Sequence, residues 1–526
     1  MRAVCAALPR GLHSYGAGGV SAPTFDLGKL HGGLRLAPRK DLSTAQPIQH
    51  MPVPEQLVVP ITQHVGDAAH PVVGIGERVL KGQLIAESDG HISAPVHASS
   101  SGKVVAIEPW PVSRRSGGTA PCIVIECDGD DRTIELSEEI TPFETLDQEI
   151  LFQKILQGGI VGLGGAVFPT AQKLMHASIT PLEHLILNGV ECEPYISCDD
   201  MLMREQADEV LGGAKILMHA LGVQHCFVAV ESDKPEAIHA LEDAWVELQD
   251  DRIAIKQVPT IYPSGAEDQT VQLVTNKEVP SGGLPTDVGC VVQNVGTAAA
   301  VYRWIAKAEP LISRVTTVTG DGIPAPMNVF ARIGTTVGDI VNFVGGYNEK
   351  AHHLVIGGAM TGKSVTTDRV PLVKATNAIL VLSDEEQFGN EAPCIRCGDC
   401  AAVCPVQLLP QQLFWFACAD NEQKLRDYGL MDCIECGCCD LVCPSHIPLT
   451  ADFRMAKARM RELADEKARA ERARQRYEAR TERLEREKLI RAQQLEAQKR
   501  QARGPDAIRD VLDRTSRKEP GDRGDD

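Results

Sequence analysis

Eight cysteines in a repeated spacing constrain this chain more than any other feature. The stretch CIRCGDCAAVCP, residues 394–405, has the pattern C-x2-C-x2-C-x3-C-P, and CIECGCCDLVCP, residues 433–444, repeats it. This spacing is typical of [4Fe-4S] clusters, because a short loop can wrap three thiolates around one cluster and the fourth must come from elsewhere. Paired motifs exchange their last cysteine, so we expect two clusters in one ferredoxin-type domain.

The exchange defines two sets of ligands. The first cluster is expected on Cys394, Cys397, Cys400 and Cys443. The second is expected on Cys433, Cys436, Cys439 and Cys404. A pair of zinc sites is the alternative, since zinc also takes four thiolates. Zinc sites usually pair two short Cys-Cys knuckles, so the duplicated three-cysteine run with a remote Cys-Pro favours iron–sulfur. The spacing assigns no ligand role to Cys418 or Cys438.

Composition narrows the class of protein. The chain has 526 residues and a formal net charge of −18, which argues against a nucleic-acid binder that neutralises phosphates. Its length predicts several domains. No stretch has the roughly 18–20 consecutive apolar residues that cross a bilayer, so we expect the chain to stay in the cytoplasm. Ten of its 17 cysteines fall between Cys394 and Cys443, and this local density favours metal over disulfides.

A small β domain is expected near the N-terminus. Over residues 47–128, short Val- and Ile-rich runs alternate with glycines, as in VGIGERVLKGQLIAES and HISAPVHASSSGKVVAI. These runs resemble the biotinyl/lipoyl barrel-sandwich family, whose carriers present a modified lysine at a hairpin tip. The corresponding tip here reads SDG, residues 88–90, so we interpret the domain as structural. An N-terminal arm and connecting segment, residues 1–46, precede it.

The rest of the chain divides into four parts. Over residues 143–305, helical periods alternate with short apolar runs, which predicts an α/β domain. Residues 312–383 return to short strands and Gly-rich turns and resemble the SLBB β-grasp module. The cysteine section, residues 384–450, is expected to be mostly helical. The charged tail, residues 451–526, consists of strong helix formers with few apolar positions, which favours a solvated helix over a docking or membrane helix, with about the last twenty residues disordered.

A glycine-rich stretch begins the predicted α/β domain. GGIVGLGGAVFPTAQK, residues 158–173, contains five glycines that would let backbone N–H groups approach a phosphate, and Lys173 could meet the charge. It has neither the Walker pattern nor the dinucleotide G-x-G-x-x-G pattern. From these residues alone, a phosphate loop and a tight packing turn are equally open.

The loop and three later stretches resemble the FMN-bearing NADH dehydrogenase subunit of respiratory complex I. The later stretches are LILNGVECEPYISCDD, YPSGAEDQ and VVQNVGT. The resemblance implies that the phosphate end of FMN lies at Gly162, Gly164, Gly165 and Lys173. It implies that the flavin ring or ribityl chain lies near Asn188, Glu191 and Asn294. It also implies that the NAD(H) dinucleotide borders Glu193, Tyr262 and Glu267.

The chain departs from the complex I pattern at several positions, and the departures concern the NADH contacts more than FMN. An arginine is replaced by Leu163 and a loop glycine by Val167. Acidic residues of the pattern are replaced by Val190, Ala266 and Gly296.

The order of the blocks narrows the family. The segment FDLGKLHGGLRLAPRKDLSTAQPIQHMPVP is followed by the barrel-sandwich, flavin, SLBB and cysteine blocks. From Phe25 to Leu449 this order resembles the C subunit of the Rnf (Rsx) electron-transport complex. The resemblance implies a multidomain α/β and β architecture, with a barrel-sandwich hybrid, a complex I flavoprotein-like FMN domain, an SLBB β-grasp and a helical two-[4Fe-4S] domain. His31 to Gly33, Lys40 and Thr44 match the N-terminal segment of that family.

The family resemblance also implies a function. The chain would be a peripheral subunit on the cytoplasmic face of a bacterial inner membrane, bound to membrane-embedded Rnf-type subunits that translocate ions. It would pass electrons between NADH, FMN, two [4Fe-4S] clusters and a ferredoxin-like carrier or other redox target. A flavin suits this role because it exchanges electrons both in pairs and singly.

Two alternatives remain open from the sequence. A soluble flavoprotein of the cobalamin-reductase type shares the flavin, β-grasp and two-cluster blocks. An electron-wire subunit would keep the clusters but lack NADH activity. The replacement of acidic residues of the complex I pattern by Val190, Ala266 and Gly296 supports this alternative.

Overall fold

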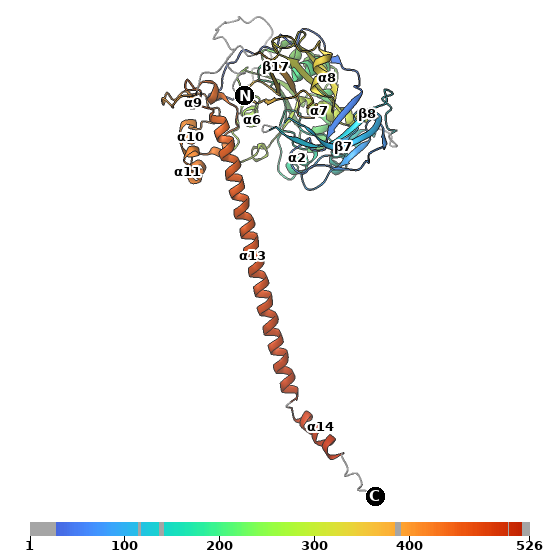
Figure 1. Cartoon of the computed structure of the whole chain (residues 1–526), viewed down its shortest axis with the longest axis vertical. Coiled ribbons are helices and arrows are strands. Elements are labelled where there is room, and N and C mark those ends of the chain that lie inside the picture. Colours follow the sequence, from blue (N-terminus) through green and yellow to red (C-terminus); the bar gives the residue numbers. More distant parts are fainter. Residues whose placement is uncertain (1–27, 114–116, 136–140, 384–390, 503, 518–526) are drawn as a thin grey trace. The chain divides into compact units, whose positions relative to one another are not determined.

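The computed structural model describes residues 28–113, 117–135, 141–383, 391–502 and 504–517 (Figure 1). Contacts divide the chain into two units, residues 1–454 and 455–526, and each is described by itself. Most of the expected N-terminal arm lies outside the described residues.

Two antiparallel sheets form the first domain of unit 1. One sheet has the order β2-β8-β7-β4 and the other β3-β5-β6. The strands are β2 (Gln56–Pro60), β3 (His70–Pro71), β4 (Arg78–Val79), β5 (Leu84–Glu87), β6 (Val96–His97), β7 (Gly102–Pro111) and β8 (Thr119–Cys127). Their inward side chains, including Leu57, Ile85 and Ile123, form one fully buried apolar core. The SDG stretch lies in the connection between β5 and β6.

A parallel sheet with the order β11-β10-β9-β12 forms the centre of the second domain. Its strands are β9 (His184–Gly189), β10 (His225–Glu231), β11 (Ile253–Val258) and β12 (Cys290–Asn294). Both faces of a parallel sheet are covered, so its strands read as continuous apolar runs, and Leu185 to Leu187 are fully buried. The chain builds β9, β10 and β11 in one direction and then places β12 on the other side of β9. This reversal lies between β9 and β12, where open α/β sheets bind ligands beyond the carboxyl ends of the strands.

Helices connect these strands. They are η1 (Phe143–Thr145), α1 (Gln148–Gln157), α2 (Thr170–Ala177), α3 (Cys198–Glu205), α4 (Ala207–Leu221), α5 (Pro235–Leu248), α6 (Glu267–Thr275), η2 (Pro285–Val288) and α7 (Val295–Lys307). Helix α4 has the sequence ADEVLGGAKILMHAL, whose apolar residues recur with helical spacing, and it buries its apolar face in the hydrophobic core of this domain. Its residue Gly213 permits a close approach to α7, because an added Cβ would lie 2.0 Å from the Ala298 carbonyl oxygen.

A six-stranded mixed sheet forms the third domain. Its order is β1-β14-β13-β17-β15-β16. The strands are β1 (Gln49–His50), β13 (Ser313–Thr319), β14 (Met327–Arg332), β15 (His353–Ile356), β16 (Lys363–Val365) and β17 (Ala378–Leu382), with helix α8 (Val337–Phe343). Strand β1 falls within the predicted bounds of the barrel-sandwich domain, but it precedes the strands of the first domain and pairs in parallel with β14. This pairing ties the N-terminal segment to the third domain.

Short helices dominate the cysteine section, as predicted. They are α9 (Asp399–Ala402), α10 (Pro410–Cys418), α11 (Glu422–Asp427), η3 (Leu430–Asp432) and α12 (Cys438–Leu441). Helices α9 and α12 occupy equivalent positions in the two motifs, each beginning just after a glycine in the left-handed region, Gly398 or Gly437.

The tail is helical. Helix α13 (Leu449–Ala502) is continuous (Figure 1). Every side chain from residue 472 to 502 is exposed, and the choice of a solvated over a docking helix stays a prediction. The expected disorder at the end is wrong for Pro505–Ser516, which forms α14 with proline in its first turn, where the missing N–H is not needed. The rest of that end lies outside the described residues. None of the helices among the described residues combines the length and apolar character that crossing a membrane requires.

Lys374 lies where three domains meet. Its side chain comes from the third domain, is 1% exposed, and donates to the carbonyl oxygens of Pro95 (3.1 Å) and Gly159 (2.6 Å). Burial lowers the pKa of this ammonium to about 7. Two barrel-sandwich histidines, His64 and His97, face it, and burial together with the Lys374 charge lowers both of their pKa values.

We expect the Lys374→Met variant to lose part of the pH dependence of stability. An unfolded lysine keeps its proton up to its ordinary pKa of 10.5, so the unfolded chain binds more protons between pH 7 and 10.5, and stability rises with pH there. Between pH 7 and 9 this contributes about 2 kcal/mol to the free energy of unfolding. The two histidines titrate below this window. Chemical denaturation at pH 7 and 9 should show a smaller rise for the variant, and an equal rise would contradict this assignment.

Candidate functional site

Asn188 and Asn294 lie near the carboxyl ends of the two strands that flank the reversal in the parallel sheet. They are direct partners in the register of β9 and β12, so both lie at the carboxyl edge. A cavity of about 860 Å³ opens there. Nine of the ten residues predicted for FMN and NAD(H) line it: Gly162, Gly164, Lys173, Asn188, Glu191, Glu193, Tyr262, Glu267 and Asn294. The tenth, Gly165, lies in the same loop as Gly162 and Gly164. The structure therefore brings the predicted residues together, while their individual roles remain predictions.

The glycine loop forms one wall. It closes through a bridge between Val161 and Pro169 and a hydrogen bond from Gly162 N to Phe168 O of 2.9 Å. Val167, which stands where the complex I pattern has glycine, has φ +47°. This left-handed conformation is rare for a β-branched residue, and it explains why glycine suits the position. The Val167 carbonyl accepts a hydrogen bond from Val65 N, so the barrel-sandwich domain supports the loop from outside.

Lys173 and Glu267 face each other at the mouth. The Lys173 ammonium, on α2, donates to Glu267 Oε1 at 2.6 Å and to Val292 O at 2.7 Å. Both side chains are partly exposed, so the pair can separate at little cost. The lysine predicted for the phosphate end thus has a carboxylate partner in this state.

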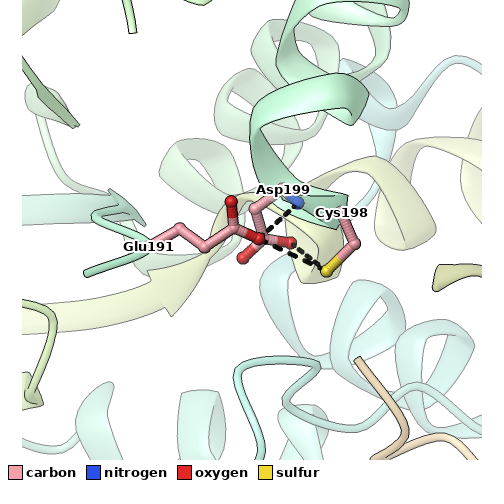
Figure 2. Close-up of side chains that lie close together, drawn as sticks. All are labelled: Glu191, Cys198 and Asp199. Carbon is pink, nitrogen blue, oxygen red and sulfur yellow. Dashed lines mark hydrogen bonds between the residues drawn. The ribbon is translucent and has the colours of Figure 1, made fainter. Parts of the chain in front are cut away.

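Glu191 caps helix α3. Its carboxylate accepts hydrogen bonds from Asp199 N at 2.9 Å, Asp200 N at 3.4 Å and the Cys198 thiol at 3.4 Å (Figure 2). Figure 2 shows Cys198 and Asp199 at the start of the helix, turned toward this carboxylate. Acceptors at a helix N-terminus stabilise the free N–H groups and the helix dipole. The trio of Glu191, Cys198 and Asp199 is therefore explained by helix capping and needs no metal.

Lys40 holds the loop that carries Glu191. Its buried ammonium donates to the carbonyl oxygens of Glu191 (2.5 Å), Glu193 (3.4 Å) and Ile196, and it lies 3.5 Å from the Glu191 carboxylate. Within the same loop Tyr195 has φ +72°, and its N–H donates to Pro38 O at 2.8 Å. The N-terminal segment thus fixes the shape of this cavity wall.

Asp199 is a cavity residue that the sequence did not single out. Its carboxylate accepts a hydrogen bond of 2.7 Å from the Asn294 side chain, whose oxygen in turn caps α7 at Gly296 N (2.8 Å). Burial and the neighbouring Glu191 carboxylate raise the pKa of Asp199 to about 6, against the opposing effect of the Asn294 amide. Asp199 can therefore change its protonation near neutral pH.

Glu193 connects the cavity to the third domain. Its carboxylate accepts hydrogen bonds from Met360 N (2.6 Å), Thr361 N (2.7 Å) and Thr361 Oγ1 (2.9 Å). Burial raises the pKa of Glu193, while these hydrogen bonds oppose the rise. The side chain predicted to border the dinucleotide thus holds an SLBB loop.

Tyr262 connects the cavity to the cysteine section. Its hydroxyl donates to the carbonyl oxygen of Cys436 at 2.6 Å, and Ile434 and Cys436 themselves line the cavity. One cysteine of the second predicted ligand set, Cys436, therefore lies in the wall of this cavity.

The two cysteine loops share one backbone shape. Equivalent residues of the loops adopt left-handed φ values, namely Arg396 and Glu435 (59° and 58°), Gly398 and Gly437 (88° and 81°), and Gln407 and His446 (53° and 51°). A non-glycine residue in this region costs about 1–2 kcal/mol, so its repetition indicates that both loops must wrap a similar object. The loops thus fit a pair of equivalent clusters.

The two motifs also meet in space. One cavity is lined by Cys394, Cys397, Cys400 and Cys443, the complete first set. In the second set, the Cys404 thiol interacts electrostatically with that of Cys436. The last cysteine of each motif therefore lies beside the other motif, as the predicted exchange requires. Cys418 is exposed, and Cys438 is buried beside Cys436.

The large cavity fits a flavin. Gln293 is 3% exposed and lines it, and its Nε2 has no hydrogen-bond partner among the described residues, so a polar ligand atom would satisfy it. Beside Asn294, the absence of a side chain at Gly164 leaves room for a ligand to approach the backbone, since an added Cβ would be 3.4 Å from Asn294 Cβ.

Sequence reasoning missed several residues of the cavity wall, among them Asp199, Gln293, Thr361 and Ile434. Asp199 and Gln293 lie inside the stretches LILNGVECEPYISCDD and VVQNVGT that carry the resemblance, but the resemblance gave neither residue a role. Thr361 and Ile434 come from other domains, and no local pattern signals them.

Family models match four consecutive parts of the chain. They are described as the RnfC barrel sandwich hybrid domain (residues 28–130), the Nuo51 FMN-binding domain (155–303), the SLBB domain (315–364) and the 4Fe-4S dicluster domain (393–447). These matches confirm the predicted fold class and the predicted FMN and [4Fe-4S] cofactors.

Curated relatives share most of the chain. The C subunit of the ion-translocating oxidoreductase complex of Pseudomonas aeruginosa is 47% identical over 458 residues, which is 86% of this chain and 58% of the relative. That of Haemophilus influenzae strain 86-028NP is 43% identical over 467 residues, 88% of this chain and 70% of the relative. That of Vibrio cholerae El Tor Inaba N16961 is 44% identical, covering 86% and 58%. The chain thus spans less than two thirds of the Pseudomonas and Vibrio relatives.

A solved structure shows partial similarity. A chain of the NAD+-reducing [NiFe]-hydrogenase in its H2-reduced state has a TM-score of 0.43 and 17% identity, with 60% of each chain covered.

We expect the Asp199→Asn variant to gain stability mainly at neutral pH. Because the folded pKa of about 6 lies above the ordinary value of 3.8, the folded chain binds more protons between these values, and stability falls as pH rises through 6. Asparagine has no such titration, so its stability relative to wild type should increase by about 1 kcal/mol from pH 5 to 7.5. Chemical denaturation of the flavin-free chain measures this difference. Asp243→Asn, on the exposed side of α5, should follow the wild type, and an equal effect of Asp199→Asn at both pH values would contradict the assignment.

Proposed function

This chain belongs to the family formed by the C subunits of ion-translocating oxidoreductase complexes, and we propose that it carries electrons between NADH and the membrane-embedded subunits of such a complex. The electrons pass through a flavin in the large cavity and then through two [4Fe-4S] clusters. The partners are the other subunits of an Rnf-type complex, together with a ferredoxin-like carrier or other redox target. The chain is peripheral, on the cytoplasmic face of the membrane.

One observation carries this proposal. The flavin cavity and the second cysteine loop share a wall, because Ile434 and Cys436 line the cavity and the Tyr262 hydroxyl donates to Cys436 O. A flavin in this cavity lies beside the second cluster without an intervening domain. This supports the order cavity, second cluster, first cluster.

The cavity residues have complementary tasks in this proposal. Bound FMN exchanges a hydride with a nicotinamide and single electrons with an iron–sulfur cluster. The Gly162–Gly165 loop gives the phosphate access to backbone N–H groups, and Lys173 meets its charge on leaving Glu267. Asn188, Asn294 and the unpaired Gln293 Nε2 orient the flavin ring. Asp199 can hold or release a proton at its carboxylate.

The first cluster provides the exit in this proposal. Cys397, one of its predicted ligands, is exposed, whereas Cys436 of the second set is within the shared wall. An exposed ligand allows a redox partner to approach the cluster closely. The second cluster, beside the cavity, then serves as the inner relay.

A second candidate function is an electron relay without NADH activity. Two observations favour it: the Glu193 carboxylate is occupied by the backbone of Met360 and Thr361, and Lys173 is paired with Glu267. Both contacts remove groups that the complex I resemblance assigns to the phosphate or the dinucleotide.

Anaerobic titration of the reconstituted, FMN-loaded chain with NADH tests these functions. We expect the flavin absorbance to bleach and the EPR signals of reduced clusters to appear together, because NADH, FMN and the clusters form one path. If the flavin stays oxidised while dithionite reduces both clusters, NADH entry is wrong and the relay function holds. A chain that binds no FMN, with both clusters intact, would contradict electron transfer from NADH through a flavin and would favour the relay function.

A further inference from the structure

Tyr262 occupies the wall between the flavin cavity and the second cysteine loop. Its side chain is 4% exposed, it lines the cavity, and its hydroxyl donates to Cys436 O at 2.6 Å. The complex I resemblance assigns this tyrosine to the dinucleotide border. In the structure its only polar side-chain atom points away from that role and toward the backbone of a predicted cluster ligand.

A strap from the N-terminal segment, residues 31–34, joins Tyr262 to the other side of the same cluster. Leu34 pairs with Tyr262 through two backbone hydrogen bonds, from Leu34 N to Tyr262 O at 2.7 Å and from Tyr262 N to Leu34 O at 2.8 Å. One residue earlier, Gly33 N donates to Val403 O at 2.9 Å. Val403 directly precedes Cys404, the ligand that the second cluster takes from the first motif.

Two glycines allow the strap to fit between these segments. An added Cβ on Gly32 would lie 2.7 Å from Val403 C and O and 2.8 Å from Cys404 O. An added Cβ on Gly33 would lie 2.8 Å from Tyr262 O. Both contacts are shorter than side chains tolerate, and both glycines have positive φ, 55° and 75°. The strap therefore contacts Cys404 on one side and Tyr262 on the other.

We propose that Tyr262 and the 31–34 strap position the second cluster. Together they hold the backbones of Cys404 and Cys436 against the flavin cavity, and they set the reduction potential of the cluster. The proposal rests on the ligand sets of the proposed function. Tyr262 acts through Cys436 and is a positioning residue. It needs no contact with the dinucleotide.

The hydrogen bond has a defined electrostatic direction. The Tyr262 O–H dipole points its positive end at the carbonyl oxygen of Cys436, a predicted ligand of the second cluster. Hydrogen bonds and dipoles near the ligands raise the potential of an iron–sulfur cluster, because they stabilise the added electron. Removing the hydroxyl should therefore make the second cluster harder to reduce and leave the first cluster unchanged.

The test compares Tyr262→Phe with wild type in the full chain carrying FMN and both clusters. Redox titration followed by EPR should show a two- to tenfold lower ratio of reduced to oxidised second cluster at a fixed solution potential, the size expected for one hydrogen bond. The first cluster and the FMN content should not change. Tyr347→Phe is the matched control, since Tyr347 donates to Asp368 in the SLBB domain, away from both loops, and it should leave both clusters as in wild type.

Gly32→Ala tests the strap independently. It should alter the EPR signal of the second cluster or lower the occupancy of that cluster, because the added methyl group meets the Cys404 backbone. Gly346→Ala is the matched control: Gly346 also has positive φ (82°), but an added Cβ there meets nothing within 4 Å. An equal effect of both variants would indicate general backbone strain and would contradict the strap.

The outcomes separate this inference from the proposed function. Wild-type protein that lacks a second [4Fe-4S] cluster by iron content and EPR overturns the ligand assignment and with it the inference. Wild-type protein with both clusters, combined with unchanged second-cluster potential in Tyr262→Phe, overturns the inference alone. If Tyr262→Phe changes the affinity for NADH but not the reduction potential of the second cluster, the inference is overturned and Tyr262 borders the dinucleotide, as the complex I resemblance implies.

Discussion

The parallel pairing of β9 with β12 is the constraint on which the rest of the site depends. Because these strands are neighbours in space but far apart in sequence, Asn188 and Asn294, near their carboxyl ends, meet at one edge. The loops that leave this edge carry Glu191 to Asp199 on one side and the first turn of α7 on the other. The cavity exists because both chain segments must turn away from the same line of hydrogen bonds. Every other domain is arranged around that opening.

The neighbouring domains complete the walls. The barrel-sandwich domain supports the glycine loop through Val65, and the SLBB domain binds Glu193 through Met360 and Thr361. The cysteine section contributes Ile434 and Cys436. Each contact joins segments at least a hundred residues apart, so the cavity forms only when all four domains are docked correctly. A fold built this way couples the flavin environment to the position of the second cluster, with the N-terminal strap threaded between them.

Local patterns in the sequence predicted the α/β domain, the small β domain and the paired cysteine loops, because glycine-rich turns, apolar strand runs and cysteine spacings are short-range signals. The ten residues expected at FMN and NAD(H) came from the resemblance to the complex I subunit, and nine of them line the cavity. The division of the cysteines into two ligand sets stays a prediction. The hydrogen-bond partners were not predictable, because they cross domains: Glu193 binds the backbone of the SLBB domain, and Tyr262 binds the backbone of Cys436. Asp199 was missed because its role depends on Asn294, which is distant in sequence. The helix at Pro505–Ser516 was missed because a Gly-Pro pair can end one helix and begin another.

The order that we propose for the two clusters along the electron path follows from the wall that the flavin cavity shares with the second cysteine loop. Freeze-quench EPR tests this order after a light pulse that reduces the bound flavin, with EDTA present as the sacrificial electron donor. The experiment compares wild type with Cys404→Ala, which removes a ligand of the second cluster, and Cys443→Ala, which removes a ligand of the first. We expect the second cluster of Cys443→Ala to be reduced as fast as in wild type, and the first cluster of Cys404→Ala to be reduced much more slowly. Equally fast reduction of the first cluster in Cys404→Ala would show that electrons reach it without the second cluster, and would contradict this order.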